Sequence, residues 1–450
     1  MAVKTKINMK RYESWGKYPK AKPAAVEPIY WPTESLRLDE YDKSVLPYAW
    51  GRSYGDSCLN DGGILLDTTR LSRFIAFDQE KGLLRCEAGV TLDACLKQIV
   101  PRGWFLPVTP GTKYVSVAGA IANDVHGKNH YKGGTFGCYV TQFELLRSNG
   151  ERLICSPTQN VELFRATIGG LGLTGLILWA EFRLKPIKTA YVDMERIKFD
   201  NLDEFFEISA RSHEAYEYTV AWLDCLAEGD KLGRGWLVRG NHAEGEYPLK
   251  VHKDPLITVP FNFPSFVLNR LTMKSFNYFT YNLYQRPKKV RQVVHYEPFF
   301  YVLDMIKNWN RIYGKRGFMQ YQFVLPNDDN HRVLRDIINH IARSGEGFLN
   351  VFKEFGDVPS PGMLSFPRKG VTLALDFPNN GVKTLRLLNE LDELVREANG
   401  VLYPAKDGRM SAPDFQRFYP QWTEFAQYVD PKFSSSFWRR VTTPNGTEMM

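Results

Sequence analysis

His126 and Lys128 are titratable side chains that follow directly after a run of small residues. Residues 117–122 read Val-Ala-Gly-Ala-Ile-Ala, and residues 123–130 then bring asparagine, aspartate, histidine and lysine side chains close together. Small side chains let a flat, bulky ligand lie against the backbone. His126 and Lys128 offer a proton acceptor and a positive charge beside that ligand, so the stretch predicts a cofactor site.

Two glycine-rich loops lie before and after this stretch along the chain. Residues 51–57 read Gly-Arg-Ser-Tyr-Gly-Asp-Ser, and residues 166–175 contain four glycines ahead of the apolar run 176–180. Glycine permits the positive φ angles that turn successive N–H groups toward an anion, and Arg52 and Ser53 add donors. The first loop therefore predicts a diphosphate site. Neither loop has the spacing of a nucleotide P-loop or of a Rossmann fingerprint.

Several short motifs, spread from the first quarter of the chain to the last, occur together in one group of flavoproteins. They are residues 51–57, 110–112, 119–130, 221–222, 320–323, 350–353 and 405–407. The chain resembles the vanillyl-alcohol oxidase superfamily, also called the p-cresol methylhydroxylase (PCMH) type. Within it, the closest resemblance is to the oxidase subunits of decaprenylphosphoryl-ribose 2-epimerase, and it covers nearly the whole chain.

The resemblance implies an FAD enzyme that oxidises the 2-hydroxyl of a polyprenylphosphoryl-β-D-ribose to a 2-keto sugar. A separate NADH-dependent short-chain reductase would then complete the epimerisation to the arabinose form. Flavin oxidation of an alcohol needs a base for the hydroxyl proton. Lys406 and His126 match family positions at the reactive face of the flavin, and a desolvated lysine can also act as a base. The sequence leaves the choice between them open.

The predicted FAD contacts are mostly glycines and small or polar residues. They are Gly51, Arg52, Ser53, Tyr54, Gly55, Asp56, Pro110, Gly111, Thr112, Gly119, Ala122, Asn123, His126, Gly127, Asn129, Gly172, Gly175, Ile177 and Tyr403. Asp56 stands where many superfamily members carry the histidine that bonds covalently to the flavin. Aspartate cannot form that bond, so we expect non-covalent FAD.

The predicted substrate contacts come from the middle of the chain and from the flavin loops. They are Tyr54, Lys128, Trp222, Gln320, Gln322, Lys353, Phe355, Thr372 and Ala374. Strand alternation places Gln320 and Gln322 on one face and Met319, Tyr321 and Phe323 on the other. Lys353 is a candidate phosphate contact, because an ammonium serves as a point charge.

Three pocket positions depart from the family pattern. Ala374 replaces a cysteine that nitroaromatic inhibitors trap in mycobacterial members, which makes covalent trapping impossible here. Val220 replaces a serine and Thr372 replaces an asparagine, so we expect fewer polar contacts to the substrate.

The pattern of elements predicts an α+β, two-domain PCMH-type fold. Residues 1–187 are expected to form the FAD-binding domain, to which residues 402–450 return, and residues 188–401 an antiparallel-sheet substrate domain covered by helices. A helix capped by Thr91 should run to Pro101. Asn149 and Gly150 predict a hairpin turn between two apolar runs, and helices are expected at 333–341 and 384–398.

Composition narrows the partners and the compartment. The net charge is +8, but 50 acidic residues lie among the basic ones, so nucleic acid is not expected. The six cysteines show no Cys-x-x-Cys spacing and suggest reduced thiols in a cytoplasmic protein. No metal is expected. No apolar stretch approaches the ~20 residues of a membrane span.

The stretch between Glu246 and Tyr301 interleaves aromatic rings with lysine and arginine. It suits peripheral contact with the inner face of the cell membrane. An equally weighted alternative is that these rings are core residues with a solvated basic rim.

Two other functions stay open at this point. An alditol or aldonolactone oxidase of the D-arabinono-1,4-lactone type would use oxygen on a free sugar, but such enzymes usually keep the histidine that Asp56 replaces. A non-catalytic flavin- or lipid-binding partner would have little use for both His126 and Lys406. The electron acceptor, the lipid length and the oligomeric state cannot be predicted from the sequence.

Overall fold

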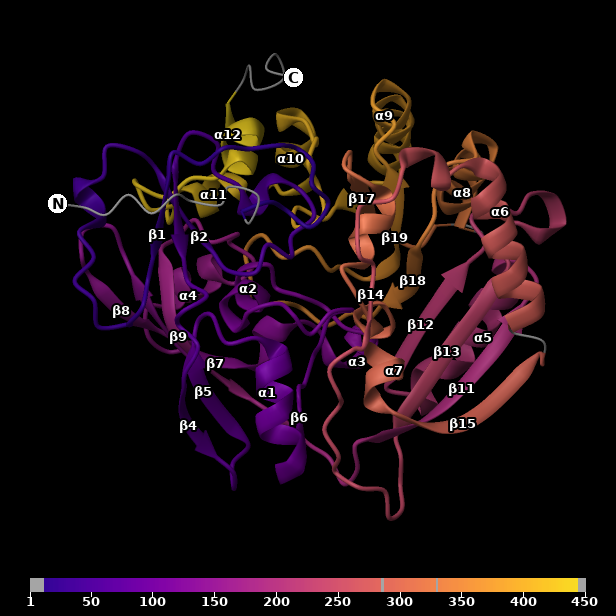
Figure 1. Cartoon of the computed structure of the whole chain (residues 1–450), viewed down its shortest axis with the longest axis horizontal. Helices are drawn as coiled ribbons and strands as arrows, with labels where there is room; N and C mark the ends of the chain where they lie inside the picture. Colours follow the sequence, from indigo (N-terminus) through magenta and orange to yellow (C-terminus); the bar gives the residue numbers. More distant parts are fainter. Residues whose placement is uncertain (1–11, 285–286, 329–330, 444–450) are drawn as a thin grey trace.

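The computed structural model describes residues 12–284, 287–328 and 331–443, which form two groups of sheets and helices side by side (Figure 1). The first group, which includes the indigo and purple N-terminal part, contains a three-stranded parallel sheet and a five-stranded antiparallel sheet. The parallel sheet has the order β1 (Ala25–Pro28), β3 (Ile64–Asp67), β2 (Val45–Tyr48). The antiparallel sheet has the order β4 (Phe74–Asp78), β5 (Leu83–Glu87), β9 (Leu176–Arg183), β7 (Val140–Leu146), β8 (Arg152–Cys155).

Four helices belong to this first group. They are α1 (Leu92–Ile99), α2 (Val117–Ala122), α3 (His130–Gly133) and α4 (Val161–Thr167). The predicted cap of α1 is present, because the Ala94 N–H donates to Thr91 Oγ1 at 3.1 Å. The predicted hairpin is also confirmed, since Leu146 pairs with Arg152 across the Asn149-Gly150 turn.

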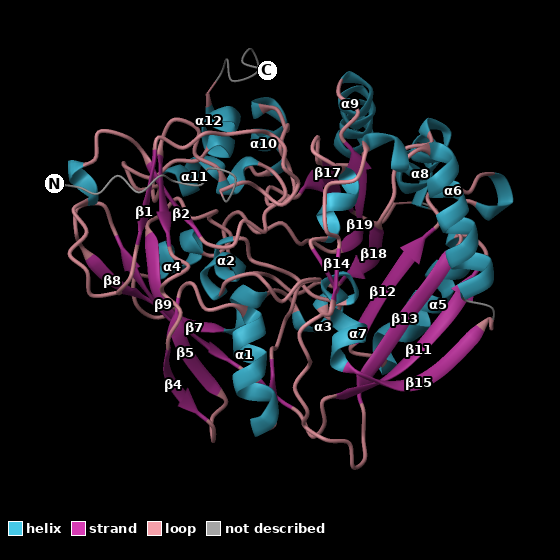
Figure 2. Cartoon of the chain, viewed as in Figure 1, coloured by secondary structure: helices cyan, strands magenta, loops and turns pink. Residues whose placement is uncertain are grey.

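The second group is built on one eight-stranded antiparallel sheet (Figure 2). Its order is β15 (Lys289–His295), β11 (Tyr191–Phe199), β13 (Gly235–His242), β12 (Tyr218–Leu223), β18 (Asn350–Phe355), β19 (Gly370–Pro378), β17 (Phe318–Leu325), β20 (Val401–Leu402). Helices α5 (Leu202–Ala215), α8 (Arg332–Ser344) and α9 (Val382–Glu397) share one apolar core with this sheet. The expected α+β class, with helices covering an antiparallel sheet, is therefore confirmed.

Alternation along β17 follows the prediction and decides which residues meet the helices. Tyr321 is buried in the core and its hydroxyl donates to Asp392 of α9 at 2.8 Å. Gln320 and Gln322 lie on the opposite face, toward the first group. The apolar residues of the strand are buried against the helices, so the amides are left to face a ligand.

The remaining elements connect these two groups or lie at their edges. Two short pairs, β6 (Trp104–Phe105) with β10 (Lys185–Pro186) and β14 (Ile257–Thr258) with β16 (Ile306–Lys307), join distant segments. Helices α6 (Arg270–Tyr278) and α7 (Tyr296–Phe300) flank the large sheet. Within the described parts of the chain, no helix is long and apolar enough to cross a bilayer.

The C-terminal helices α10 (Ala412–Phe418), α11 (Trp422–Ala426) and α12 (Ser436–Thr442) return to the first group. The Val45 N–H donates to the Lys432 carbonyl at 2.8 Å, which ties this segment to β2. Arg440 of α12 contacts Asp56 at 2.7 Å. These contacts support a domain division near residues 187 and 402, which remains our proposal.

Candidate active site

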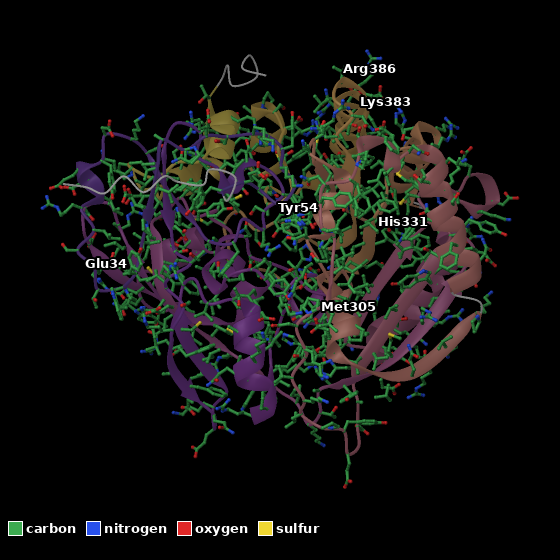
Figure 3. The ribbon with its side chains drawn as sticks, in the orientation of Figure 1. Glu34, Tyr54, Met305, His331, Lys383 and Arg386 are labelled. Carbon is green, nitrogen blue, oxygen red and sulfur yellow. The ribbon has the colours of Figure 1, made fainter. Side chains whose placement is uncertain are left out.

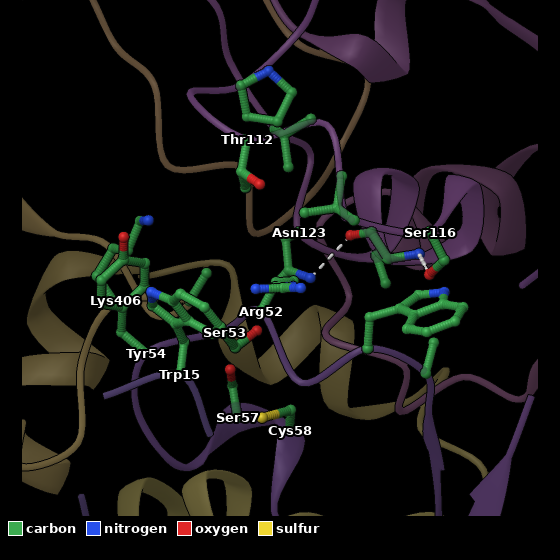
Figure 4. A pocket seen from close by; sticks show the side chains of 18 of the residues that line it. Trp15, Arg52, Ser53, Tyr54, Ser57, Cys58, Thr112, Ser116, Asn123 and Lys406 are labelled. Carbon is green, nitrogen blue, oxygen red and sulfur yellow. Dashed lines mark hydrogen bonds between the residues drawn. The ribbon is translucent and has the colours of Figure 1, made fainter. Parts of the chain in front are cut away.

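A cavity lies between the two groups and is lined from both (Figure 4). The first group contributes the loop around Arg52 and Tyr54, the loop at Pro110, and α2 with the loop after it. The second contributes residues of β12, β17, β18 and β19, and the turn that carries Lys406. Tyr54 accordingly lies between the two halves of the molecule (Figure 3).

Glycine backbone and two unsatisfied buried donors shape the first half of the cavity. Gly51 and Gly172 have φ angles of +59° and +75°, a region that other residues rarely adopt. A Cβ added at Gly111 would meet nothing within 4 Å. Arg52 Nε and Ser57 Oγ are buried and have no hydrogen-bond partner among the described residues. Open space and unsatisfied donors fit the diphosphate and the polar ring edge of FAD.

Helix α2 supplies the flat wall that the small residues predict. The Gly119 N–H donates to the capping Ser116 Oγ at 3.1 Å, and Asn123 Nδ2 closes the other end on the Gly119 carbonyl at 2.8 Å (Figure 4). The Tyr403 hydroxyl donates to the Asn123 carbonyl at 2.7 Å and fixes the turn that follows the helix. Gly119 and Ala122 line the cavity, so a planar ligand can approach the helix closely.

His126 is held on both ring nitrogens by residues of the large sheet. Its Nδ1 lies 3.0 Å from Lys353 Nζ, and its Nε2 lies 3.0 Å from Gln322 Nε2. Lys353 Nζ also donates to the Gly127 carbonyl at 2.7 Å. Burial, and then the positive charge that Lys353 carries whenever it is protonated, place the pKa of His126 well below its usual value, so the imidazole is neutral.

Lys406 also lines the cavity, but its surroundings differ from those of His126. Its Nζ lies 3.8 Å from the ring centre of Tyr54, and it makes no hydrogen bond to any described residue (Figure 4). Burial lowers the pKa of Lys406 to about 7, while the charge of Asp376 opposes that shift. A lysine whose pKa is near neutrality is an unprotonated amine for part of the time, and can accept a proton.

Asp376 stands behind this second cluster and is fully buried. One carboxylate oxygen accepts from Gln320 Nε2 at 2.6 Å, and the other accepts from the Tyr313 hydroxyl at 3.0 Å. Burial raises the pKa of Asp376 to about 7, and its hydrogen bonds and the charge of Lys406 limit that rise. Lys406 and Asp376 therefore titrate in the same range and bias each other.

Most of the predicted contacts line the cavity together. They are Gly51, Arg52, Ser53, Tyr54, Pro110, Gly111, Thr112, Gly119, Ala122, Asn123, His126, Gly127, Lys128, Gly172, Gly175, Ile177, Gln320, Gln322, Lys353, Ala374, Tyr403 and Lys406. Those that the structure places behind the wall are Gly55, Asp56, Asn129, Trp222, Phe355 and Thr372.

The residues behind the wall have structural partners instead. Asp56 pairs with Arg440 rather than facing the flavin half of the cavity. Trp222 stacks on Trp236 with ring centres 6.0 Å apart, and Phe355 packs edge-on against His126 at 4.9 Å. The Thr372 hydroxyl donates to a neighbouring strand carbonyl at 2.7 Å.

Several lining residues were not predicted. The Arg52 guanidinium lies over the Trp15 ring, 4.2 Å from the ring centre. Asp304 accepts a hydrogen bond from the Lys113 N–H at 2.8 Å, beside the loop at Pro110. Neither has a local sequence signal, because the partner lies far away along the chain. Asp376, which does not line the cavity but lies behind Lys406, did have a signal, because it shares a strand face with Ala374, two residues earlier.

Comparisons with known proteins agree with this geometry. Residues 37–156 match the family model described as FAD binding domain. The chain is 39% identical to the decaprenylphosphoryl-beta-D-ribose oxidase of Mycolicibacterium smegmatis over 420 residues, which are 90% of each chain. It is 33% identical to a putative D-arabinono-1,4-lactone oxidase of Neurospora crassa over 122 residues, 27% of this chain and 22% of that one. It is 28% identical to the human delta(24)-sterol reductase over 186 residues, 41% of this chain and 32% of that one.

Proposed function

The chain belongs to the family of FAD-dependent oxidoreductases that includes decaprenylphosphoryl-β-D-ribose oxidase, and we propose that it oxidises the 2-hydroxyl of a polyprenylphosphoryl-β-D-ribose to the 2-keto sugar. The observation that carries the proposal is the Lys406 amine, which bonds to no described residue and lines the cavity together with the small residues of α2 and the amides of Gln320 and Gln322.

Bound FAD supplies the hydride acceptor. The chain supplies the base, the placement of the sugar and the exclusion of water. We assign the base to Lys406, because its amine is free to take the hydroxyl proton, whereas both nitrogens of His126 are engaged. Gln320, Gln322 and Lys353 would hold the sugar phosphate against the flavin wall.

We further propose that the FAD is bound without a covalent link. Asp56 is buried and occupied by Arg440, at 2.7 and 3.0 Å, so the superfamily's attachment position is used here for an ion pair between the loop and α12. Acid precipitation should leave the yellow colour in the supernatant. A coloured pellet would contradict this proposal.

The aldonolactone oxidase alternative rests on the match to the Neurospora crassa protein. That match covers 122 residues and 27% of this chain, whereas the match to the ribose oxidase covers 420 residues and 90% of it. We therefore favour a lipid-linked sugar phosphate as substrate. An NADH-dependent short-chain reductase is the partner we propose for the keto product, because epimerisation needs a second, reducing step.

We also propose peripheral contact with a membrane through the surface around α6. Phe261, Phe266 and Leu271 are 63%, 76% and 75% exposed, which argues that much of this stretch is not core. Tyr281 is buried, as the alternative interpretation expected, whereas the Tyr284 side chain and Arg286 lie outside the described residues.

Charge and position favour a lipid surface over an acidic protein groove. Residues 255–296 contain six lysines and arginines and no aspartate or glutamate. The exposed Val302 and Met305 flank Leu303 and Asp304, which line the cavity (Figure 3 labels Met305). A lipid tail could therefore pass from this surface to the cavity.

Co-sedimentation with anionic liposomes tests this surface. The double variant Phe266→Ser, Leu271→Ser should lose most of its binding. Val382→Ser is the matched control, because Val382 is also 75% exposed but lies on α9. Unchanged binding of the double variant would remove the membrane proposal.

The oxidation itself is tested by anaerobic titration of the FAD-loaded protein with farnesylphosphoryl ribose. Loss of the flavin absorbance band would support both the cofactor and the half-reaction. A band that persists with this substrate but bleaches with a free aldonolactone would overturn the proposed substrate.

A further inference from the structure

The hydrogen bonds around His126 have a direction that can be worked out from their two ends. Thr372 Oγ1 lies 2.7 Å from the Phe323 carbonyl, which can only accept. Thr372 therefore donates its single hydroxyl hydrogen to the Phe323 carbonyl. Its contact with Gln322 at 3.3 Å must then be one in which the amide nitrogen of Gln322 donates. Thr372 thus fixes which end of the Gln322 amide faces it.

The same amide nitrogen lies 3.0 Å from His126 Nε2, so this ring nitrogen must accept. A neutral imidazole carries one proton, which is consequently on Nδ1. Lys353 Nζ lies 3.0 Å from Nδ1, so the Nδ1–H of His126 donates and Lys353 Nζ accepts. It donates to the Gly127 carbonyl at 2.7 Å. An ammonium has no lone pair, so Lys353 must be a neutral amine.

The charges that surround Lys353 agree with this arrangement. Lys128 and Lys406 face it, and His126 is neutral, so no described acid compensates a charge on Lys353. Burial and these two like charges place the pKa of Lys353 well below its usual value. Electrostatics therefore acts in the same direction as the hydrogen-bond pattern, toward the uncharged amine.

We propose that Thr372 is a positioning residue that, through Gln322, holds His126 as the Nδ1–H tautomer and Lys353 as an uncharged amine until an anionic ligand arrives. The next step rests on the proposed function. The phosphate of the substrate would bind at Lys353, and Lys353 would take up one proton from solvent at the same time. The resulting ammonium can no longer accept from His126, so that hydrogen bond breaks and Lys353 turns its hydrogens to the anion. Lys353 is therefore uncharged before the anion binds.

The tautomer can be measured without any substrate. The protein with bound FAD is labelled with 15N-histidine, and the His126 signals among the eight histidines are identified by their loss in His126→Gln. We expect a protonated Nδ1 and an unprotonated Nε2. Thr372→Ser, which keeps the hydroxyl, should retain this pattern, and Thr372→Val should give mixed tautomers. A protonated Nε2 in the wild type would overturn the proposal.

The proton uptake is measured with farnesyl methyl phosphate, a phosphodiester that has no sugar to oxidise and whose negative charge does not change near pH 7, so a proton taken up on binding goes to the protein. Calorimetric titration at pH 7 in two buffers of different ionisation enthalpy should show one proton taken up per ligand bound. Binding without proton uptake, or no binding, would overturn the phosphate part of the proposal. Since flavin bleaching by farnesylphosphoryl ribose is a separate readout, failure of the proposed oxidation would be seen independently.

Discussion

Lys353 and Lys406 come from different segments of the chain and face one cavity, but their neighbours differ. Lys353 Nζ contacts His126 and the Gly127 carbonyl, and no acid among the described residues opposes the lowering of its pKa. The Lys406 amine makes no hydrogen bond to a described residue, and Asp376 acts on it through its charge. Burial lowers the pKa of both amines, yet Lys353 is held in a chain of hydrogen bonds, whereas the Lys406 amine bonds to no described residue.

The comparison shows that burial alone does not assign a role to a lysine. The Lys353 amine suits binding, because it gains a proton and a positive charge when an anion arrives. The free amine suits catalysis, since it can take a proton without first breaking a protein hydrogen bond. Asp376 adds a carboxylate that holds the pKa of the free lysine near neutrality.

The largest effect should follow from removing the free amine. Lys406→Ala should lower the rate of flavin reduction by ~10²–10⁴-fold, the usual contribution of a general base. The protein should keep its yellow colour, because the diphosphate half of the cavity is untouched. Stopped-flow absorbance measures the rate, and Lys369→Ala, at a 66% exposed lysine, is the control. Near-normal reduction would remove Lys406 from the chemistry.

A smaller effect should follow from removing the tied amine. Lys353→Met should raise KM for the prenylphosphoryl sugar by ~10-fold or more, the usual loss for one hydrogen bond to a charged group. The rate at saturating substrate should change little. If this variant lost the rate and kept its KM, the two lysines would have to exchange roles.

The smallest effect should come from the charge behind the free lysine. Asp376→Asn keeps the size of the side chain but removes the charge that raises the pKa of Lys406. Lys406 is active when unprotonated, so flavin reduction falls as pH drops through its pKa. In a plot of the flavin reduction rate against pH, the fall of the rate on the acid side should therefore move to lower pH by about 1 unit in the variant. A fall that stays in place would show that Asp376 acts only on packing.

Local patterns were sufficient to predict much of the fold and the cavity. The glycine loop at Gly51, the small residues of α2 and the alternation of Gln320 and Gln322 are properties of short segments. Each has a direct structural consequence: a positive φ, a flat wall, or a shared strand face. The structure places all of these segments on the cavity.

The remaining features depend on contacts between distant segments. Asp56 meets Arg440 across 384 residues, so nothing near Asp56 indicated that it would be occupied by an ion pair. Thr372 was expected to touch the substrate, but its hydroxyl is used inside the sheet. Which side chains form pairs is decided by strand register and by the return of the C-terminal helices, and neither can be read from one segment.

The most direct test of the account is the pH dependence of anaerobic flavin reduction in the wild type and in His126→Gln. Lys406 is the base in this account and its pKa is about 7, so both proteins should show an acid limb near that value. The account would be contradicted if the fall of the rate at acid pH disappeared in His126→Gln but persisted in Lys406→Ala. His126 would then be the base.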